Sequence, residues 1–155
     1  YGDMALKEVK KWINFRHRLV PYLYHTACQT HQSGIPMIRP LVMEYPKDPI
    51  AKIQNLSYML GDALLISPGF DRDEYELYLP EGRWQDIESK EVYEGMTFVH
   101  IENKAFADGG TSLRVFQKEG TSIPLFAQKE VLHVPAQLWK QEDLEFMTFQ
   151  KKDVD

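Results

Sequence analysis

The segment Gly34-Ile35-Pro36-Met37-Ile38-Arg39-Pro40-Leu41 divides the sequence into a helical part and a part made of short strands. Over residues 4–32, apolar side chains recur at the three-to-four-residue spacing of an α-helix. Pro21 lies inside that pattern and removes one backbone donor, so we expect the helix to bend or split between residues 16 and 20.

The two ends of this helical stretch carry residues suited to cap it. Asp3 is a candidate N-cap, and Gly34 a candidate C-terminal stop. A helix this long with one apolar stripe needs a partner, because packing rather than propensity must stabilise it. The chain also opens at Tyr1, inside the predicted helix. We therefore expect it to be a piece of a longer protein.

After Gly34 the pattern changes to short runs of strand-forming residues separated by turn residues. Many short strands with frequent turns predict an antiparallel β-sandwich, so the expected fold class is mainly β with an N-terminal helix. Pro40 predicts an edge strand or a bulge, and a short helical turn is expected within residues 50–58. The predicted strands are residues 37–44, 63–67, 75–79, 96–101, 113–116, 122–126 and 145–149.

Composition and charge limit the class of protein. A hydrophobic fraction of 43% with 26% charged residues is typical of a globular domain. The net charge of −5 disfavours nucleic acid as a partner. The residues up to Pro40 include six basic and two acidic side chains, and the rest include twelve basic and twenty-one acidic. The longest stretch without acidic or basic residues, 19–38, is too polar for a membrane span.

Most catalytic templates are absent from the sequence. It contains no phosphate-binding loop of the G-x-x-x-x-G-K type and no G-x-G-x-x-G. Ser33 and Ser67 lack the leading glycine of a nucleophile elbow. Asn55 begins a glycosylation sequon that matters only in a secreted protein. The single cysteine, Cys28, excludes an internal disulfide.

Two polar groups and one aromatic group have a structural and a functional interpretation. His25, Cys28 and His31 fan across a helix without a carboxylate beside them, so we interpret them as ordinary helix residues rather than a zinc site. The acidic cluster next to the strand that begins at Tyr75 is interpreted as a solvated turn rather than an acid/base pair; it comprises Asp71, Asp73, Glu74 and Glu76. The aromatic group is interpreted as core rather than a sugar-stacking platform; it comprises Trp84, Tyr93, Phe98 and Trp139.

Six phrases, in order and spacing, closely resemble the C-terminal half of family 31 glycoside hydrolases, the α-glucosidase and α-xylosidase family. The resemblance covers about residues 1–128. The phrases are Arg18-Leu19-Val20-Pro21-Tyr22-Leu23-Tyr24, Gly34 to Leu41, Tyr45-Pro46-Lys47-Asp48, Leu60-Gly61-Asp62-Ala63-Leu64-Leu65-Ile66-Ser67-Pro68, Tyr78-Leu79-Pro80-Glu81-Gly82-Arg83-Trp84, and Val115-Phe116 through Gly120 to Ile123-Pro124-Leu125.

The resemblance implies three parts. Residues 1–34 would be the last helix of a (β/α)8 catalytic barrel, residues 35–128 a proximal β-sandwich, and residues 129–155 the start of a distal β-domain. A complete barrel needs about 250 residues, so it cannot lie within this chain. The motif residues are expected to be structural; they are Arg18, Pro21, Tyr22, Tyr24, Gly34, Arg39, Pro40, Gly61, Pro68, Tyr78, Pro80, Gly82, Trp84, Gly120 and Pro124.

Several motif residues have a physical reason for their type. Arg39 could fork onto a carboxylate or onto carbonyls. Gly61, Gly82 and Gly120 suit turns that need a positive φ. Pro80 and Pro124 are expected to end strands at sheet edges.

The resemblance also implies the chemistry of the parent enzyme. The family hydrolyses α-glycosidic bonds with retention, through two barrel aspartates about 5–5.5 Å apart. Asp86 and Asp62 resemble parts of the catalytic phrases but fall within sandwich segments. We therefore expect no catalytic, substrate-binding or metal-binding residue here, and no cofactor.

The expected partner is the catalytic barrel of the parent chain. Carbohydrate is expected to be bound as substrate by the parent enzyme, not by this part of it. A homo-oligomer is an open alternative, and neither nucleic acid nor membrane is expected. The compartment is undetermined, with the cytoplasm slightly favoured. Departures at Gly69, at residues 85–87 and at residues 117–119 leave glucoside or xyloside preference undecided.

Two further interpretations come from other classes. A free-standing carbohydrate-binding module would explain the sandwich pattern and the aromatic content. A purely protein-binding sandwich would explain the separation of basic and acidic residues along the chain.

Overall fold

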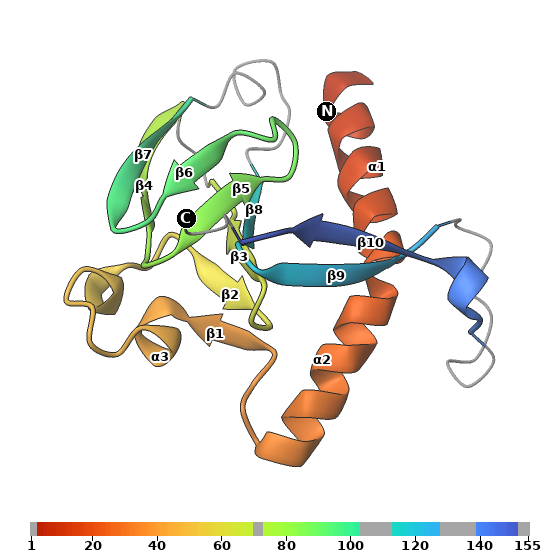
Figure 1. Ribbon diagram of the computed structural model, residues 1–155. Helices are drawn as coiled ribbons and strands as arrows, with labels where there is room; N and C mark the ends of the chain where they lie inside the picture. Colours follow the sequence, from red (N-terminus) through yellow and green to blue (C-terminus); the bar gives the residue numbers. More distant parts are fainter. Residues whose placement is uncertain (1–2, 70–72, 103–112, 128–138, 152–155) are drawn as a thin grey trace.

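Two helices precede a series of short strands in the computed structural model, which describes residues 3–69, 73–102, 113–127 and 139–151 (Figure 1). The helices are α1 (Asp3–Arg18) and α2 (Val20–Ser33). The predicted class, mainly β with an N-terminal helical region and antiparallel sheets, is confirmed. No helix in the described ranges is long and apolar enough to cross a membrane.

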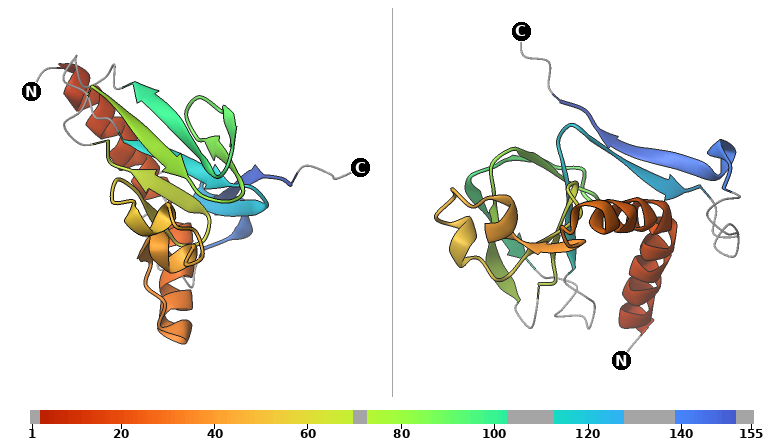
Figure 2. Two further views of the ribbon diagram at one scale, coloured as in Figure 1. Left: turned by 90° about the vertical axis from the view of Figure 1, so that its left-hand side faces the viewer. Right: turned by 90° about the horizontal axis from the view of Figure 1, so that it is seen from below.

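The helical region bends at Leu19, which separates α1 from α2 (Figure 2). Pro21 falls in the first turn of α2, where its missing N–H removes no helical hydrogen bond. The amide of Leu19 donates to the Phe15 carbonyl at 2.9 Å, so the backbone stays paired through the bend. The split that Pro21 predicted is therefore confirmed.

The capping prediction is confirmed at one end of the helical region. Gly34 closes α2 with a left-handed φ of 74°, and its amide donates to the Thr30 carbonyl at 2.8 Å. Asp3 is itself helical and lies in the first turn of α1 rather than before it.

The strands in the described ranges form three antiparallel sheets. The largest has six strands in the order β1-β2-β3-β8-β5-β6. Its members are β1 (Ile38–Pro40), β2 (Tyr58–Leu60), β3 (Leu64–Ser67), β8 (Arg114–Lys118), β5 (Arg83–Asp86) and β6 (Val92–Glu94). The two smaller sheets pair β4 (Glu74–Leu79) with β7 (Thr97–Glu102), and β9 (Thr121–Phe126) with β10 (Leu144–Phe149). Short helical pieces are α3 (Leu41–Glu44), η1 (Ala51–Ile53) and η4 (Gln141–Asp143).

The six-stranded sheet is the central layer, because it carries a core on each face. Toward β4 and β7 it contributes Met59, Leu65, Trp84 and Phe116, which meet Tyr75, Leu77, Leu79, Val99 and Ile101. Toward the helices and β9 it contributes Leu64, Ile66 and Val115, which meet Leu19, Tyr22, Ile123 and Leu125. A β-sandwich with a helical layer on its outer side results.

Two expectations were wrong in detail. Residues 41–44 form the helical turn α3 rather than a strand, because Pro40 has no N–H with which to continue the ladder of the edge strand β1. The short helical turn expected within residues 50–58 is confirmed as η1.

Pro124 does not end a strand but lies within β9, opposite Phe146. A two-stranded sheet leaves alternate amides unpaired, so a proline can occupy such a position without losing a ladder bond. Pro80 does follow the last residue of β4, as expected.

Candidate functional site

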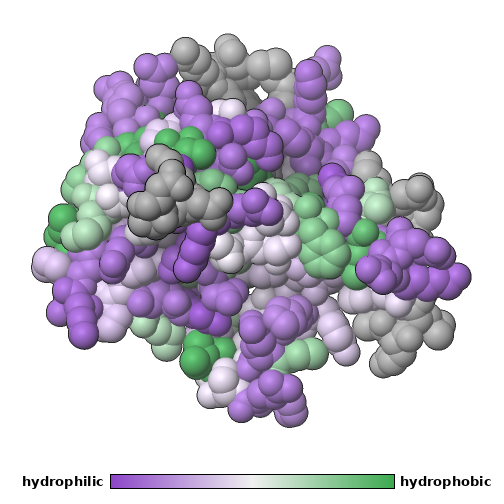
Figure 3. All heavy atoms as spheres, in the orientation of Figure 1, coloured by the Kyte–Doolittle hydropathy of each residue, from purple (hydrophilic) through white to green (hydrophobic). Residues whose placement is uncertain are grey.

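An apolar groove of about 610 Å³ lies between the helices and the outer face of the central sheet. Val9 and Ile13 of α1 form one wall, and Tyr58 and Val115 of the sheet belong to the other. Of the described residues that line the groove, only Arg16 is charged. Hydrophilic side chains cover most of the face seen in Figure 3, so an apolar lining of this size stands out.

The exposed stripe of α1 extends the groove along the helix. Leu6, Val9 and Ile13 are 61%, 43% and 47% exposed, although they recur at the spacing of one helical face. The next turns continue into the core through Leu19, which is 4% exposed. The same apolar stripe is thus covered at one end and uncovered at the other.

A second hollow, of about 380 Å³, separates α1 from β10 and the β5–β6 turn. Its rim is charged: Lys11 Nζ lies 2.6 Å from both Glu8 and Glu88. Trp12 lines both the hollow and the groove, and its buried indole N–H has no acceptor among the described residues. Trp12 was missed in the sequence, although it lies at helical spacing from Val9 and Phe15.

The bend between the helices is fixed to the last two strands by Arg18. Its Nε donates to the Phe126 carbonyl at 2.9 Å, and its guanidinium pairs with Glu145. Further along α2, Tyr24 is 49% exposed. Its ring packs edge-on against that of Trp139, with the two ring centroids 5.6 Å apart. Glu145 was not identifiable as a partner from sequence, because 127 positions separate it from Arg18.

Tyr22 connects α2 to the turn between β2 and β3. Its hydroxyl donates to the Leu60 carbonyl at 2.7 Å and accepts from the Ala63 amide at 3.2 Å. Burial raises the pKa of Tyr22 to about 12. Gly61 passes directly beside this hydroxyl with a φ of 63°.

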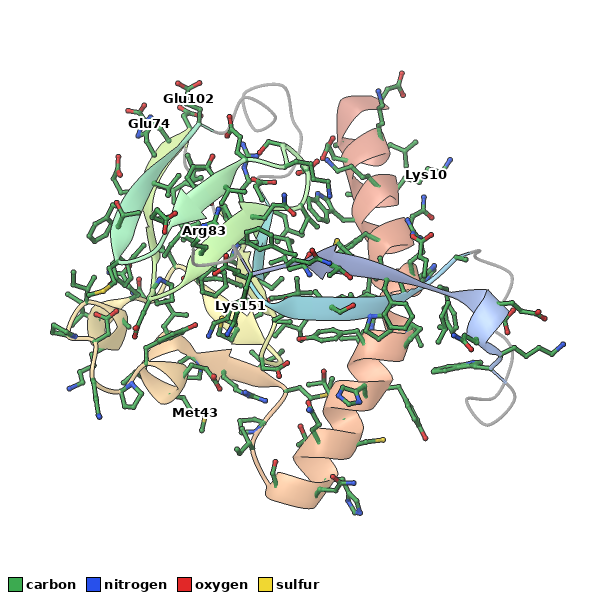
Figure 4. All side chains as sticks on the ribbon, viewed as in Figure 1. Lys10, Met43, Glu74, Arg83, Glu102 and Lys151 are labelled. Atoms are coloured by element: carbon green, nitrogen blue, oxygen red, sulfur yellow. The ribbon has the colours of Figure 1, made fainter. Side chains whose placement is uncertain are left out.

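Arg39 braces the edge of the central sheet with a forked contact. Its Nε donates to the Pro36 carbonyl at 2.8 Å, and Nη1 donates to Glu44 Oε1 at 2.5 Å. The residue is 8% exposed, so both contacts are shielded. Nearby Met43 of α3 points away from the body of the protein (Figure 4).

On the sandwich side, two buried aromatic residues have polar partners. The Tyr78 hydroxyl donates to Asp48 Oδ2 at 2.6 Å, and Trp84 Nε1 donates to the Pro80 carbonyl at 2.8 Å. Pro68 follows β3 and is half-buried. The remaining motif glycines, Gly82 and Gly120, take φ values of 118° and 77°, in line with the expected turns.

The four aromatic residues considered above as a sugar-stacking platform do not lie on one common surface. Trp84 is fully buried, and Tyr93 is half-buried against the core. Phe98 is 48% exposed on β7, where its ring meets Tyr78. Trp139 packs edge-on against Phe126 beside α2.

The two aspartates that resemble catalytic phrases have different environments. Asp86 is 3% exposed; its Oδ1 accepts from the amides of Glu88 and Ser89, and its Oδ2 lies 3.6 Å from Arg114. Asp62 is exposed. The engaged oxygens of Asp86 shape the β5–β6 turn.

The side chains considered above as a metal site or an acid/base pair do not form such a site in the described residues. His25, Cys28 and His31 are exposed on α2. In the described ranges no three His, Cys, Asp or Glu side chains are grouped to hold a metal ion. Of the acidic cluster, Glu74 and Glu76 lie on β4, while Asp71 lies outside the described residues.

Comparison with known proteins identifies the family. The sequence profile of the glycosyl hydrolase family 31 C-terminal domain matches residues 34–130. The chain belongs to glycosyl hydrolase family 31, and it contains the C-terminal domain of that family.

Curated relatives are much longer than this chain. It is 35% identical over 113 residues to neutral alpha-glucosidase AB of Homo sapiens, a match covering 70% of the chain and 11% of the relative. It is 31% identical over 137 residues to alpha-glucosidase 2 of Bacillus thermoamyloliquefaciens, covering 87% of the chain and 17% of the relative. The chain thus spans less than a fifth of these relatives.

Solved structures give the same result. The cycloalternan-forming enzyme of Listeria monocytogenes is 32% identical, with a TM-score of 0.72 over 88% of this chain and 13% of the enzyme. The family 31 dextranase of Flavobacterium johnsoniae is 31% identical, with a TM-score of 0.67 over 75% of this chain and 14% of the enzyme.

Proposed function

We propose that this chain is the C-terminal accessory region of a retaining α-glycosidase, and that it braces the catalytic domain without being active alone. The intact parent would hydrolyse α-glucosides or α-xylosides. Support comes from the family's C-terminal profile and from relatives of which the chain spans 11% and 17%.

The proposed lack of activity rests on the acidic residues that resemble catalytic phrases. Retaining hydrolysis needs two carboxyl groups about 5–5.5 Å apart, facing a bound sugar. Asp86 is held by two backbone amides in a turn, and Asp62 is exposed on a different turn. The catalytic carboxylates are therefore proposed to lie in another part of the parent enzyme.

The groove carries the proposed role of the helices. We assign α1 and α2 to the last helix of a (β/α)8 barrel, with the groove as the face that the rest of the catalytic domain covers. Docking would then remove the remaining exposed surface of Val9 and Ile13, which are 43% and 47% exposed. Complete burial of an exposed aliphatic side chain contributes about 1.5–3 kcal/mol, so each would gain roughly half of that. Trp12 would be offered an acceptor for its indole N–H at the same interface.

The remaining division follows the resemblance. Residues 35–128 are proposed as the proximal β-sandwich and residues 129–155 as the start of a distal β-domain. Because β10 pairs along the whole of β9, the β9–β10 sheet would join the two.

The deciding experiment compares two substitutions on α1. Ile13→Glu should lower the thermal midpoint of the intact parent enzyme, because it places a charge in the covered groove. Lys10→Glu, on a side chain that points away from the body (Figure 4), is the matched control and should leave the midpoint unchanged. In the 155-residue chain alone neither substitution should matter. Equal midpoints for both variants of the parent would contradict the proposed interface.

A second experiment tests inactivity directly. The purified chain should not release aryl alcohol from an aryl α-glucoside or an aryl α-xyloside. Turnover that disappears in Asp86→Asn would instead make Asp86 catalytic and remove the accessory role.

A further inference from the structure

The outer face of the β4–β7 sheet carries an ordered set of side-chain pairs. Successive side chains of a strand point to opposite faces, so every second residue shares a face. The register places Glu74 opposite Glu102, Glu76 opposite His100, and Tyr78 opposite Phe98. The alternate residues of both strands face the sandwich core; they are Tyr75, Leu77, Val99 and Ile101.

Both ring nitrogens of His100 face a carboxylate on β4. Nδ1 lies 2.9 Å from Glu76 Oε1, and Nε2 lies 3.6 Å from Glu74 Oε2. A neutral imidazole has one N–H and one lone pair, so it can donate to only one of these groups and must turn its lone pair toward the other. The imidazolium donates from Nδ1 to Glu76 and carries a second N–H that faces Glu74 at ion-pair distance, so the observed arrangement suits the protonated ring.

The same face also carries two glutamates in one register pair. Glu74 and Glu102 are directly opposite in the antiparallel register, and their labelled side chains lie at the same end of the sheet in Figure 4. Like charges directly opposite each other destabilise strand pairing. His100 lies on the same strand as Glu102 and beside Glu74, so a positive charge on its ring is attracted to both carboxylates.

We propose that His100, Glu74 and Glu76 form a proton-dependent clasp that holds β4 against β7. The clasp is closed when the imidazole is cationic and weakened when it is neutral. Because the inner face of these strands covers the sandwich core, the clasp links the stability of the sandwich to pH.

The direction of the effect follows from the charges around the ring. The hydrogen bond to Glu76, and the charges of Glu76, Glu74 and Glu102, raise the pKa of His100 above its ordinary value of 6.5, against the opposing effect of desolvation. A raised pKa in the folded state gives stability that is complete below 6.5 and lost as pH rises through the raised value. Arg114 of β8 also reaches this end of the sheet: its Nη2 donates to the Glu102 carbonyl at 3.4 Å, and its Nη1 lies 3.6 Å from Asp86 Oδ2.

Titration of the His100 ring by NMR in the full chain tests the contacts. We expect its pKa to lie above 6.5, and both Glu76→Gln and Glu74→Gln to lower it. Glu81→Gln is the matched control, since it removes the same charge from an exposed turn residue. A His100 that titrates at or below 6.5, or equal shifts in all three variants, would overturn the proposal.

Thermal midpoints at pH 5.5 and pH 8.0 test the consequence. The wild-type midpoint should fall at pH 8.0 by more than that of two variants. His100→Lys keeps its positive charge throughout and should retain the pH 5.5 stability, whereas His100→Gln should be uniformly less stable. A pH difference of the same size in all three proteins would exclude the clasp.

Discussion

The hydroxyl of Tyr22 lies where a side chain at position 61 would begin. A Cβ built on Gly61 would be 2.3 Å from Tyr22 Oη, while the same hydroxyl bonds to the backbone on both sides of that glycine. Through this contact the Tyr22 side chain of α2 packs directly against the backbone of the β2–β3 turn. It gives Gly61 two separate requirements, a positive φ and an absent side chain.

Gly61→Ala and Gly34→Ala separate those two requirements. Both glycines have similar φ values, 63° and 74°, but an added Cβ at Gly34 would meet nothing within 4 Å. Gly34→Ala should lower the free energy of unfolding by about 1–2 kcal/mol, the cost of left-handed backbone. Gly61→Ala should cost more, because it must also displace the Tyr22 hydroxyl. Urea denaturation measures both, and equal losses would contradict the contact.

A double-mutant cycle isolates the contact itself. In a Tyr22→Phe background the nearest clashing atom is absent, although the ring carbon that held it remains at 2.9 Å. Gly61→Ala should then cost less than it does in the wild type. The same cost in both backgrounds would mean that backbone strain alone makes the glycine necessary.

The Tyr78–Asp48 hydrogen bond predicts how the chain responds to acid. Burial alone raises the pKa of Asp48, but hydrogen bonds from Tyr78 and from the amides of Ala51 and Ile50 lower it below 3.8. A depressed pKa gives stability that is present above 3.8 and lost as pH falls through the lowered value. Tyr78→Phe should raise the Asp48 pKa and move acid unfolding to higher pH. Carboxyl NMR titration would contradict this if the Asp48 pKa did not rise.

The Tyr78 phenol should behave in the opposite sense at alkaline pH. Burial and the neighbouring Asp48 raise its pKa to about 12. The phenol is thus neutral in the folded chain well above the ordinary value of 10.0. Spectrophotometric titration of tyrosinate should lose one late-titrating group in Tyr78→Phe; an unchanged curve would argue against the assignment.

Arg18 should contribute more than its ion pair. Glu145 is half exposed, so Glu145→Gln should cost no more than about 1 kcal/mol. Arg18→Gln also removes the bond to the Phe126 carbonyl, and should cost about 1.5–3 kcal/mol. Lys7→Gln on exposed α1 surface is the control for charge. Equal losses for Arg18→Gln and Glu145→Gln in urea denaturation would show that the carbonyl bond contributes nothing.

Trp84 should be essential to the core rather than to ligand binding. Trp84→Ala removes a fully buried ring and should cost about 3–5 kcal/mol. Phe98→Ala, at a half-exposed aromatic position, should cost much less. Calorimetric unfolding of the two variants gives the comparison, and similar midpoints would contradict the assigned burial.

The parts of the fold that the sequence predicts best are those set by local chemistry. Pro21 and Gly34 mark the helix bend and its end, because one lacks an N–H and the other tolerates positive φ. Most of the longer strands were predicted for the same reason, because they are rich in β-branched and aromatic residues, whereas the three-residue strands β2 and β6 were not predicted. By contrast β5, Arg83-Trp84-Gln85-Asp86, has no β-branched residue, and it is a strand because it pairs with β8.

The candidate site was predictable only in part. The exposed stripe of α1 follows from helical spacing, so one wall of the groove is visible in the sequence. The other wall joins Tyr58 to Val115 across 57 positions, and nothing local brings them together. The reason for Gly61 is equally remote, because Tyr22 lies on a different element.

The pairing of β10 with β9 has a practical consequence for where the polypeptide can be shortened. A protein ending at residue 130, where the family profile ends, would lose β10 and expose the full edge of β9. It would also remove the Met147 carbonyl that accepts from the buried Gln117 amide at 2.8 Å. The Gln117 amide would keep its acceptors on Thr121 but lose the shortest of its three contacts. An open strand edge invites pairing between copies, so such a truncated protein should aggregate during expression.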